Sequence, residues 1–442
     1  LRDTPSVLRV GSEGVRDLIG RLLDVWAGTL RSRRIHVGMD EAYDLGRGAH
    51  LDAGGAYDPA GLLLRHLDQV CDLCRERGLT AMIWSDMLVR AGSATHDYFD
   101  PAARIPPALA ARLPAGLDLV FWDYYHADPA FYAQRLADHA AVGRPAVMAT
   151  GAWTWSKFWY DHGLTRANAG ACLAACRQAG VRDLLVTLWG DDGGYCDADS
   201  ALAGLGFIAA GAWGGGEDAS LERRFAAVCG ADYRTVALLP AEADRPLPLC
   251  AALWDDPLLG IHRRELAQAQ PGAALATAGT WEGLAAAMGP GRAEARPSVP
   301  AEAGAPSGPA PCAGDLGAFG DLLRWLGAKV RLLDRLDRAW ADGDRTALVS
   351  IPAEARTLAD RLDVLAAARR DRWLEHFQPF GLETLQIRYA GQAARWRELA
   401  RRLDDVLAGR CDGIPELDAV AAPRLGKLRT EWRQLASGST IL

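Results

Sequence analysis

The stretch RRIHVGMDE (residues 33–41) combines a short, β-like apolar core with an abrupt acidic end. The same pattern recurs further along the chain, where apolar runs stop in polar or aromatic residues. These runs cover residues 79–84, 117–122, 145–150 and 181–188. Helical patterns separate the five segments, and this alternation is typical of βα units around a parallel sheet.

The alternation of strands and helices fits two parallel architectures, a doubly wound sheet and a (β/α)8 barrel. No glycine-rich phosphate loop follows any of the strands, and each strand turns polar or aromatic at its carboxyl end. Both features favour the barrel, whose active site lies at the carboxyl ends of the strands. Because an eight-stranded barrel needs three more βα units, we expect a (β/α)8 TIM barrel that lacks its first strands and retains about strands 4–8.

The second half of the chain has a different pattern. Residues 289–314 are rich in Pro, Ala and Gly and predict a loop or linker, and long amphipathic helices laced with Arg and Asp follow. We expect these charges to form solvated helix faces. The predicted organisation is a partial barrel over 1–215, a connecting region over 216–288, the linker over 289–314 and a mainly α-helical C-terminal region over 315–442.

The composition excludes several classes of protein. The 442 residues carry 49 Lys and Arg against 56 Asp and Glu, a formal net charge of −7, which argues against a nucleic-acid binder. No apolar run is long enough to span a membrane. The nine cysteines show neither disulfide nor zinc spacing, so we expect core residues in a reducing, cytoplasmic compartment, with no metal and no cofactor.

Asp40 and Glu41 are the strongest chemical signal in the sequence. Neighbouring residues of an extended strand point to opposite faces, so both carboxylates can serve one pocket only if the chain bends there. A strand end is where such a bend is expected, although a solvated Asp-Glu pair is the commoner case at the start of a loop. For His36, within the strand, a buried and hydrogen-bonded side chain is the simpler interpretation. Asp86 and Asp123 also follow strands and are expected to orient neighbouring groups.

Tryptophan recurs at or just after the predicted strand ends, at Trp84, Trp122, Trp153, Trp155 and Trp189. An indole ring stacks on the apolar face of a sugar while polar neighbours bind the hydroxyl groups. Any single tryptophan is more often a core residue, but its repetition at successive strand ends indicates a carbohydrate site.

Together these segments resemble the β-N-acetylhexosaminidases of glycoside hydrolase family 20. The resemblance rests on HVGMDEA (36–42), FWDYY (121–125), GAWTW (151–155) and LWGDDG (188–193). Two segments of the second half, DPLLG (256–260) and IRYAG (387–391), are similar to the bacterial subgroup whose barrel is followed by a helical C-terminal region.

The resemblance implies hydrolysis of terminal, non-reducing β-linked N-acetylglucosamine or N-acetylgalactosamine with retention, through attack of the substrate's 2-acetamido group on C1 and an oxazolinium intermediate. It assigns Glu41 as the general acid and then the base, and Asp40 as the residue that holds the acetamido N–H. Glu41 must carry a proton near neutral pH, so we expect its carboxyl to be buried. The substrate-binding candidates are Trp84, Trp122, Tyr124, Tyr125, Trp153, Trp189 and Asp191. Of these, Tyr124 or Tyr125 would bind the acetamido carbonyl and Asp191 would accept hydrogen bonds from O4 and O6.

The missing strands raise two alternatives. The family's early strands supply an Arg that has no counterpart here, and an open arc would expose strand edges, so we interpret the chain as an N-terminally truncated copy. The first alternative is a non-catalytic remnant or sugar-binding scaffold. The second is a retaining glycosidase with a protein nucleophile, which needs a carboxylate roughly 5 Å from Glu41, from a strand end such as Asp86 or Asp191.

Overall fold

The computed structural model describes residues 1–418 except 192, 215–217, 245–246 and 292–313, and it divides into two units. The first unit comprises residues 1–151 and 167–187, and the second comprises residues 152–166 and 188–442 as far as they are described. The first unit contains a sheet with helices, whereas the described part of the second is helical.

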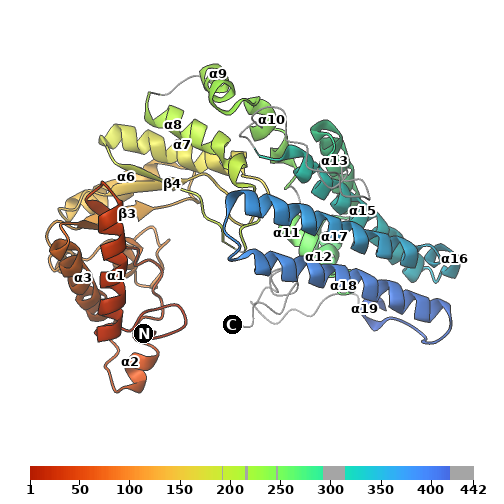
Figure 1. Ribbon diagram of the computed structural model, residues 1–442, viewed down its shortest axis with the longest axis horizontal. Helices are drawn as coiled ribbons and strands as arrows, with labels where there is room; N and C mark the ends of the chain where they lie inside the picture. Colours follow the sequence, from red (N-terminus) through yellow and green to blue (C-terminus); the bar gives the residue numbers. More distant parts are fainter. Residues whose placement is uncertain (192, 215–217, 245–246, 292–313, 419–442) are drawn as a thin grey trace. The chain divides into compact units, whose positions relative to one another are not determined.

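The sheet of the first unit has five parallel strands in the order β1-β2-β3-β4-β5 (Figure 1). They are β1 (Arg34–His36), β2 (Thr80–Trp84), β3 (Asp118–Trp122), β4 (Val147–Gly151) and β5 (Leu184–Thr187). The order follows the sequence without the reversal that a doubly wound sheet would show. The five predicted strands are therefore confirmed as a parallel half-barrel sheet, whereas its descent from a (β/α)8 barrel stays a prediction.

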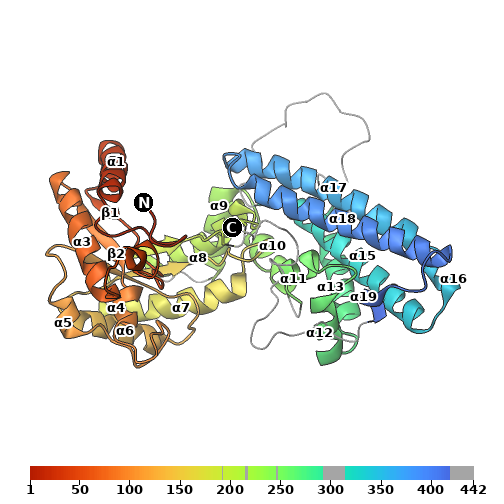
Figure 2. The ribbon, with the colours of Figure 1, turned by 90° about the horizontal axis from the view of Figure 1, so that it is seen from below.

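The first helix of the chain precedes β1, and the helices that follow it connect successive strands of the sheet (Figure 2). Together they are α1 (Glu13–Thr29), α2 (Ala49–Asp52), α3 (Pro59–Glu76), α4 (Asp86–Arg90), α5 (Pro107–Ala110), α6 (Pro129–Ala141) and α7 (His162–Ala179). Two of them begin with an aspartate cap followed by proline: Asp58 accepts the Gly61 N–H at 2.9 Å, and Asp128 accepts the Ala130 N–H at 2.9 Å. Cys71 and Cys74 are buried along α3, as core residues should be.

One ionic contact links the amino ends of strands across the sheet. Arg34 of β1 donates from Nε to Oδ2 of Asp118 on β3 at 3.0 Å, and from Nη1 to Oδ2 of Asp183 at 3.1 Å. Asp183 directly precedes β5, so the side chain of Arg34 connects the first strand with the last. These two strands, β1 and β5, are the edge strands of the described sheet.

The second unit is built from helices of very different lengths. They are η1 (Ala198–Ala201), α8 (Leu202–Ala212), α9 (Asp218–Cys229), α10 (Tyr233–Ala237), η2 (Pro240–Glu242), α11 (Leu249–Trp254), α12 (Ile261–Ala269), α13 (Ala273–Met288), α15 (Leu316–Ala341), α16 (Arg345–Leu348), α17 (Ile351–His376), α18 (Leu382–Leu407) and α19 (Pro415–Asp418). The predicted long helices are confirmed as α15, α17 and α18, and the last two lie side by side (Figures 1 and 2). Most of the predicted linker, residues 292–313, lies outside the described residues.

The core of the second unit encloses a lysine. Lys329 of α15 is buried and donates from Nζ to the carbonyls of Leu253 at 3.1 Å and Asp255 at 2.6 Å, at the end of α11. The rings of Trp325 and Trp396 lie 5.6 and 5.8 Å from Nζ. Burial lowers the pKa of Lys329 to about 7, against the raising effect of nearby carboxylates.

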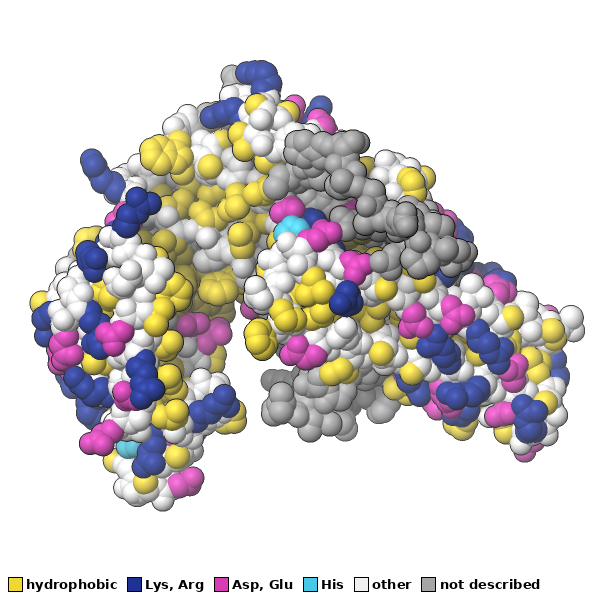
Figure 3. Space-filling view, in the orientation of Figure 1, with side chains coloured by type: hydrophobic (Ala, Val, Ile, Leu, Met, Phe, Trp, Pro, Cys, Tyr) yellow, Lys and Arg dark blue, Asp and Glu magenta, His cyan; other side chains and the backbone are white. Residues whose placement is uncertain are grey.

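The exposed faces of the long helices carry charges of both signs (Figure 3). Arg397 of α18 pairs with Asp360 at 2.9 Å and Asp363 at 2.5 Å on α17, with all three side chains exposed. Here the prediction of solvated charged faces is confirmed. None of the described helices combines the length and the apolarity needed to cross a bilayer.

Candidate functional site

The chain turns sharply where β1 ends. Gly38, Met39 and Glu41 have φ angles of 76°, 74° and 48°, in the left-handed region that side chains other than glycine rarely adopt. The ladder to β2 continues as far as Gly38, whose carbonyl accepts the Trp84 N–H at 3.1 Å. The bend that two adjacent acids require therefore follows immediately after the last paired residue.

The side chains of Asp40 and Glu41 are exposed at this turn. The backbone N–H of Glu41 donates to Oδ2 of Asp86 at 2.8 Å, and the Tyr43 hydroxyl donates to Oε1 of Glu41 at 3.2 Å. The expected burial of the Glu41 carboxyl is wrong for this unit, because the turn follows an edge strand that has a neighbour on one side only.

Asp86 is the buried carboxyl of this cluster. It begins α4 directly after β2, its side chain is 1% exposed, and its Oδ1 has no hydrogen-bond partner among the described residues. Burial raises the pKa of Asp86 to about 7; the charges of Asp40 and Glu41 add to this, and hydrogen bonds from backbone N–H groups oppose it. The expectation that Asp86 orients a neighbour is confirmed, but its burial, which the sequence pattern does not express, was missed.

His36 is held in its neutral form beside Trp84. The Gly38 N–H donates to Nδ1 of His36 at 3.1 Å, which leaves the proton on Nε2, and burial lowers the pKa of His36 to about 4. The two ring centroids lie 4.2 Å apart, and Trp84 is 9% exposed. The hydrogen bond expected of His36 is confirmed, but its side chain is half-buried rather than buried, and its Nε2 has no hydrogen-bond partner among the described residues.

Asp123 organises the loop after β3. Its carboxylate is fully buried and accepts the N–H groups of Tyr125 and His126 at 3.0 Å and the Tyr132 hydroxyl at 3.0 Å. Nδ1 of His126 donates to Oδ2 of Asp123 at 2.8 Å. The expected orienting role of Asp123 is confirmed, because its hydrogen bonds shape the segment that carries both candidate tyrosines.

The two tyrosines differ in their surroundings. Tyr124 is buried, stacks on Trp122 with ring centroids 5.5 Å apart, and lies against Gly151 at the carboxyl end of β4. Tyr125 is 50% exposed and meets the ring of Phe99 edge to face at 5.5 Å. Both lie at the carboxyl edge of the sheet, so the choice between them for the acetamido carbonyl stays open.

A cavity of about 740 Å³ borders the acid pair. Its lining includes Asp40, Glu41 and the residues of β1, with apolar side chains of α1 such as Leu22 and Trp26. Because β1 pairs only with β2, the cavity follows the free edge of the strand. Trp84 and Trp122 are not among the residues that line this cavity.

The remaining predicted site residues belong to the second unit. Trp153 stacks on Trp155 with ring centroids 4.2 Å apart, and the Thr154 hydroxyl donates to the carbonyl of Trp189 at 2.7 Å. This bond joins the loops that follow β4 and β5, and both Trp189 and Asp191 are exposed. Their participation in one site with Glu41 stays a prediction.

Among the described residues, no group of three or more His, Cys, Asp or Glu side chains is arranged so that it could hold a metal ion. The described cysteines are free, and all but Cys411 are buried. The cytoplasmic location stays a prediction.

Comparison with known proteins bears on the second unit. Residues 248–433 match the family model described as Glycoside Hydrolase 20C C-terminal domain. Within the described residues, the matched region starts just before α11 and includes the long helices α15, α17 and α18. A search of the curated proteins finds no match. Over residues 248–433 the chain is thus similar to the C-terminal domain of the family 20C glycoside hydrolases.

Proposed function

We propose that this protein hydrolyses terminal β-linked N-acetylglucosamine or N-acetylgalactosamine from glycans by substrate-assisted catalysis with retention. The observation that carries the proposal is the Asp40-Glu41 pair at a strained turn after β1, with the Glu41 backbone held by Asp86 at 2.8 Å. The match of residues 248–433 adds the carbohydrate class of substrate. Left-handed backbone at non-glycine residues is costly and is often found at functional sites.

The roles follow from the chemistry of the two acids. Glu41 protonates the leaving oxygen and then activates water, while Asp40 accepts the acetamido N–H and balances the positive charge that develops as the carbonyl oxygen attacks C1. Tyr124 or Tyr125 donates a hydrogen bond to that carbonyl. No protein nucleophile is needed, so the two acids can be neighbours in sequence.

The pocket takes its walls from the aromatic strand ends. In the proposed site Trp84, Trp122, Trp153 and Trp189 line the pocket of the sugar, and Asp191 accepts hydrogen bonds from O4 and O6. Aromatic walls with a few convergent polar groups match the amphipathic faces of a pyranose ring.

Asp86 fits poorly as a protein nucleophile in the alternative mechanism. A nucleophilic carboxylate must be ionised and must reach C1 of the sugar. Asp86 is 1% exposed, and its Oδ2 accepts a hydrogen bond from the Glu41 N–H. Burial raises its pKa to about 7. Its geometry supports a positioning role.

The two free edges of the described sheet are the observation that favours the alternative of a non-catalytic, sugar-binding scaffold. Both β1 and β5 lack a second neighbour in the described sheet, and Val186 of β5 is 37% exposed. A protein that only binds sugar would retain affinity for an N-acetylglucosamine-derived thiazoline without turning over an aryl glycoside.

The test combines turnover, stereochemistry and inhibition in the chain of residues 1–442. We expect release of nitrophenol from 4-nitrophenyl N-acetyl-β-D-glucosaminide, the β-anomer as first product by NMR, and competitive inhibition by the thiazoline. The matched control is the 4-nitrophenyl β-glucoside, which lacks the acetamido group and should not react. The α-anomer as first product, or equal rates on both glycosides, would contradict the mechanism.

A further inference from the structure

Arg372 of α17 makes a two-pronged ion pair with a buried carboxylate. Its Nε donates to Oδ2 of Asp197 and its Nη2 to Oδ1, each at 2.9 Å, and Nη2 also lies 2.8 Å from Oδ2 of Asp199. Asp197 is buried. Burial alone would raise the pKa of Asp197, but Arg372 outweighs it and holds the pKa below its ordinary range.

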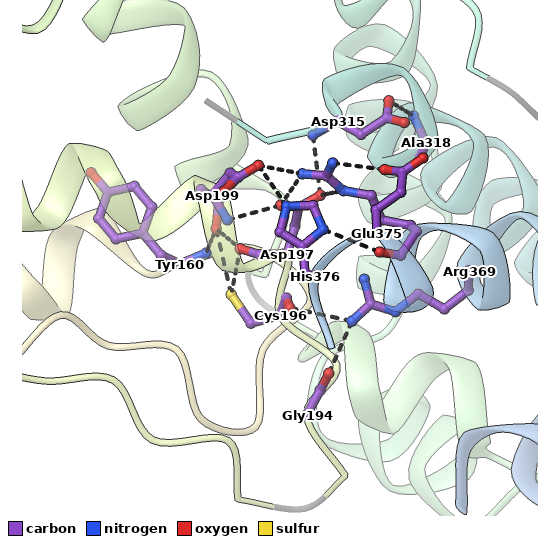
Figure 4. A network of polar contacts seen from close by, with 12 residues as sticks. Tyr160, Gly194, Cys196, Asp197, Asp199, Asp315, Ala318, Arg369, Glu375 and His376 are labelled. Atoms are coloured by element: carbon purple, nitrogen blue, oxygen red, sulfur yellow. Dashed lines mark hydrogen bonds and ion pairs between the residues drawn. The ribbon is translucent and has the colours of Figure 1, made fainter. Parts of the chain in front are cut away.

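Arg369, one helical turn earlier, holds the backbone of the same segment. Its Nη2 donates to the carbonyl of Gly194 at 2.9 Å and to that of Cys196 at 3.2 Å (Figure 4). Two arginines of α17 therefore hold residues 194–199 in place, Arg369 through backbone carbonyls and Arg372 through carboxylate side chains. Planar guanidinium groups with several fixed donors suit such multiple contacts.

The start of α15 contacts the same carboxylate. The backbone N–H of Asp315 donates to Oδ2 of Asp197 at 3.1 Å, so this oxygen accepts from two elements of the helical region. The ion pair of Arg372 differs in burial from most of the other ion pairs of α17. Most of those pairs are exposed, whereas the Arg372 side chain is 14% exposed and the Asp197 side chain is 8% exposed.

The gripped segment continues the loop that carries two proposed sugar ligands. Trp189 and Asp191 lie five and three residues before Gly194 in the sequence, and the Trp189 carbonyl accepts a hydrogen bond from the Thr154 hydroxyl at 2.7 Å. The loop is therefore anchored before and after Asp191, and its second anchor comes from a helix about 175 residues further along the chain.

We propose, resting on the proposed function, that α17 of the helical region is a positioning element for sugar recognition. Arg369 and Arg372 hold residues 194–199 and thereby fix the orientation in which Trp189 and Asp191 meet the O4 and O6 hydroxyls of the terminal sugar. The two arginines are positioning residues. Breaking a buried, charge-assisted ion pair is costly because it leaves each charge unpaired where water solvates it poorly. Such a pair therefore holds a loop segment firmly in one position.

The experiment compares Arg372→Met with Arg370→Met on the same helix. Arg370 is exposed, and its ion pair among the described residues is with its neighbour Asp371 at 3.0 Å, so its variant is the matched control. The first readout, independent of activity, is hydrogen exchange of the amides of residues 193–199. We expect Arg372→Met to raise this exchange with α18 unchanged, and Arg370→Met to leave it unchanged.

The second readout is discrimination between the N-acetylglucosaminide and its 6-deoxy analogue. We expect the wild type to prefer the parent substrate by about tenfold in kcat/KM, the value of a hydrogen bond to a charged group. In Arg372→Met the preference should fall towards one, through KM rather than kcat. Arg372→Lys keeps the charge without the planar fork and should be intermediate.

Each outcome has a defined meaning. Unchanged exchange in Arg372→Met, or a retained preference for the parent substrate, overturns the proposal. If Arg372→Met fails to fold, Arg369→Met, which removes the hydrogen bonds to the carbonyls of Gly194 and Cys196, supplies the same two readouts. A wild type without turnover refutes the proposed function and with it the recognition role, while raised exchange in the variant still identifies the contact as structural.

Discussion

Replacing Asp86 by Asn removes one ionisation from the first unit while preserving the shape of the side chain. The pKa of Asp86 is raised from an ordinary value of 3.8 to about 7, chiefly by burial. Each tenfold change in proton affinity corresponds to about 1.4 kcal/mol, so ionising this carboxyl costs the folded state about 4 kcal/mol more than the unfolded chain.

The sign follows from proton linkage. Because the folded state binds the proton more tightly, the contribution of Asp86 to stability is complete below pH 3.8 and is lost as the pH rises through about 7. The wild type should therefore lose up to about 4 kcal/mol between pH 4 and pH 8 from this group. In Asp86→Asn that loss disappears, although the buried amide, unpaired where Oδ1 was, costs about 1–3 kcal/mol at every pH.

The assay must resolve the first unit from the second, since a chain of two units need not unfold in one step. Urea unfolding at pH 5, 6, 7 and 8, read by hydrogen exchange of peptides from β2 and α4, provides this resolution. We expect the variant to gain stability relative to the wild type from pH 5 to pH 8 and to be the more stable protein at pH 8. Asp72→Asn, an exposed change on α3, is the control and should follow the wild type. Parallel pH profiles for the wild type and Asp86→Asn would refute the reasoning.

Three further predictions concern the reaction, the pocket and the helical core. Glu41→Gln should abolish hydrolysis of alkyl glycosides but spare activated aryl glycosides more, because acid assistance matters most for basic leaving groups; equal loss in a leaving-group series would count against Glu41 as the acid. Trp189→Ala should weaken thiazoline binding by about tenfold in a calorimetric titration, whereas Trp213→Ala, at a 91% exposed position, should not. Lys329→Met should remove a gain in stability between pH 7 and pH 10, because burial lowers the pKa of Lys329 to about 7. Thermal unfolding at both pH values measures this, and Gln392, which donates to the same carbonyls at 2.8 Å, keeps them paired in the variant.

The strands were predictable because their signal is local. Each is a short apolar run with a polar or aromatic end, and parallel strands buried on both faces require such runs. The same locality explains why Asp40, Glu41, Asp86 and Asp123 could be assigned to strand ends from the sequence.

Burial and long-range partners were not predictable in the same way. The sequence pattern favoured Glu41 as the buried acid, but Asp86 is the buried one, because exposure depends on which strand lies at the edge of the sheet. Arg372 and its exposed neighbour Arg370 lie on the same helix, and the local sequence pattern does not distinguish them. Only the approach of Asp197, far away in sequence, distinguishes a positioning arginine from a solvated one.

The contact of Arg34 with Asp118 and Asp183 makes the attachment of β1 depend on ionic strength. The strand has three residues and one neighbour, and these partly exposed ion pairs are each worth about 0–1 kcal/mol. The screening length falls from about 10 Å at 0.1 M salt to about 3 Å at 1 M. An uncharged sugar is not steered by salt-sensitive forces, so any decline of turnover in concentrated salt would report the loosening of the strand that presents Asp40 and Glu41.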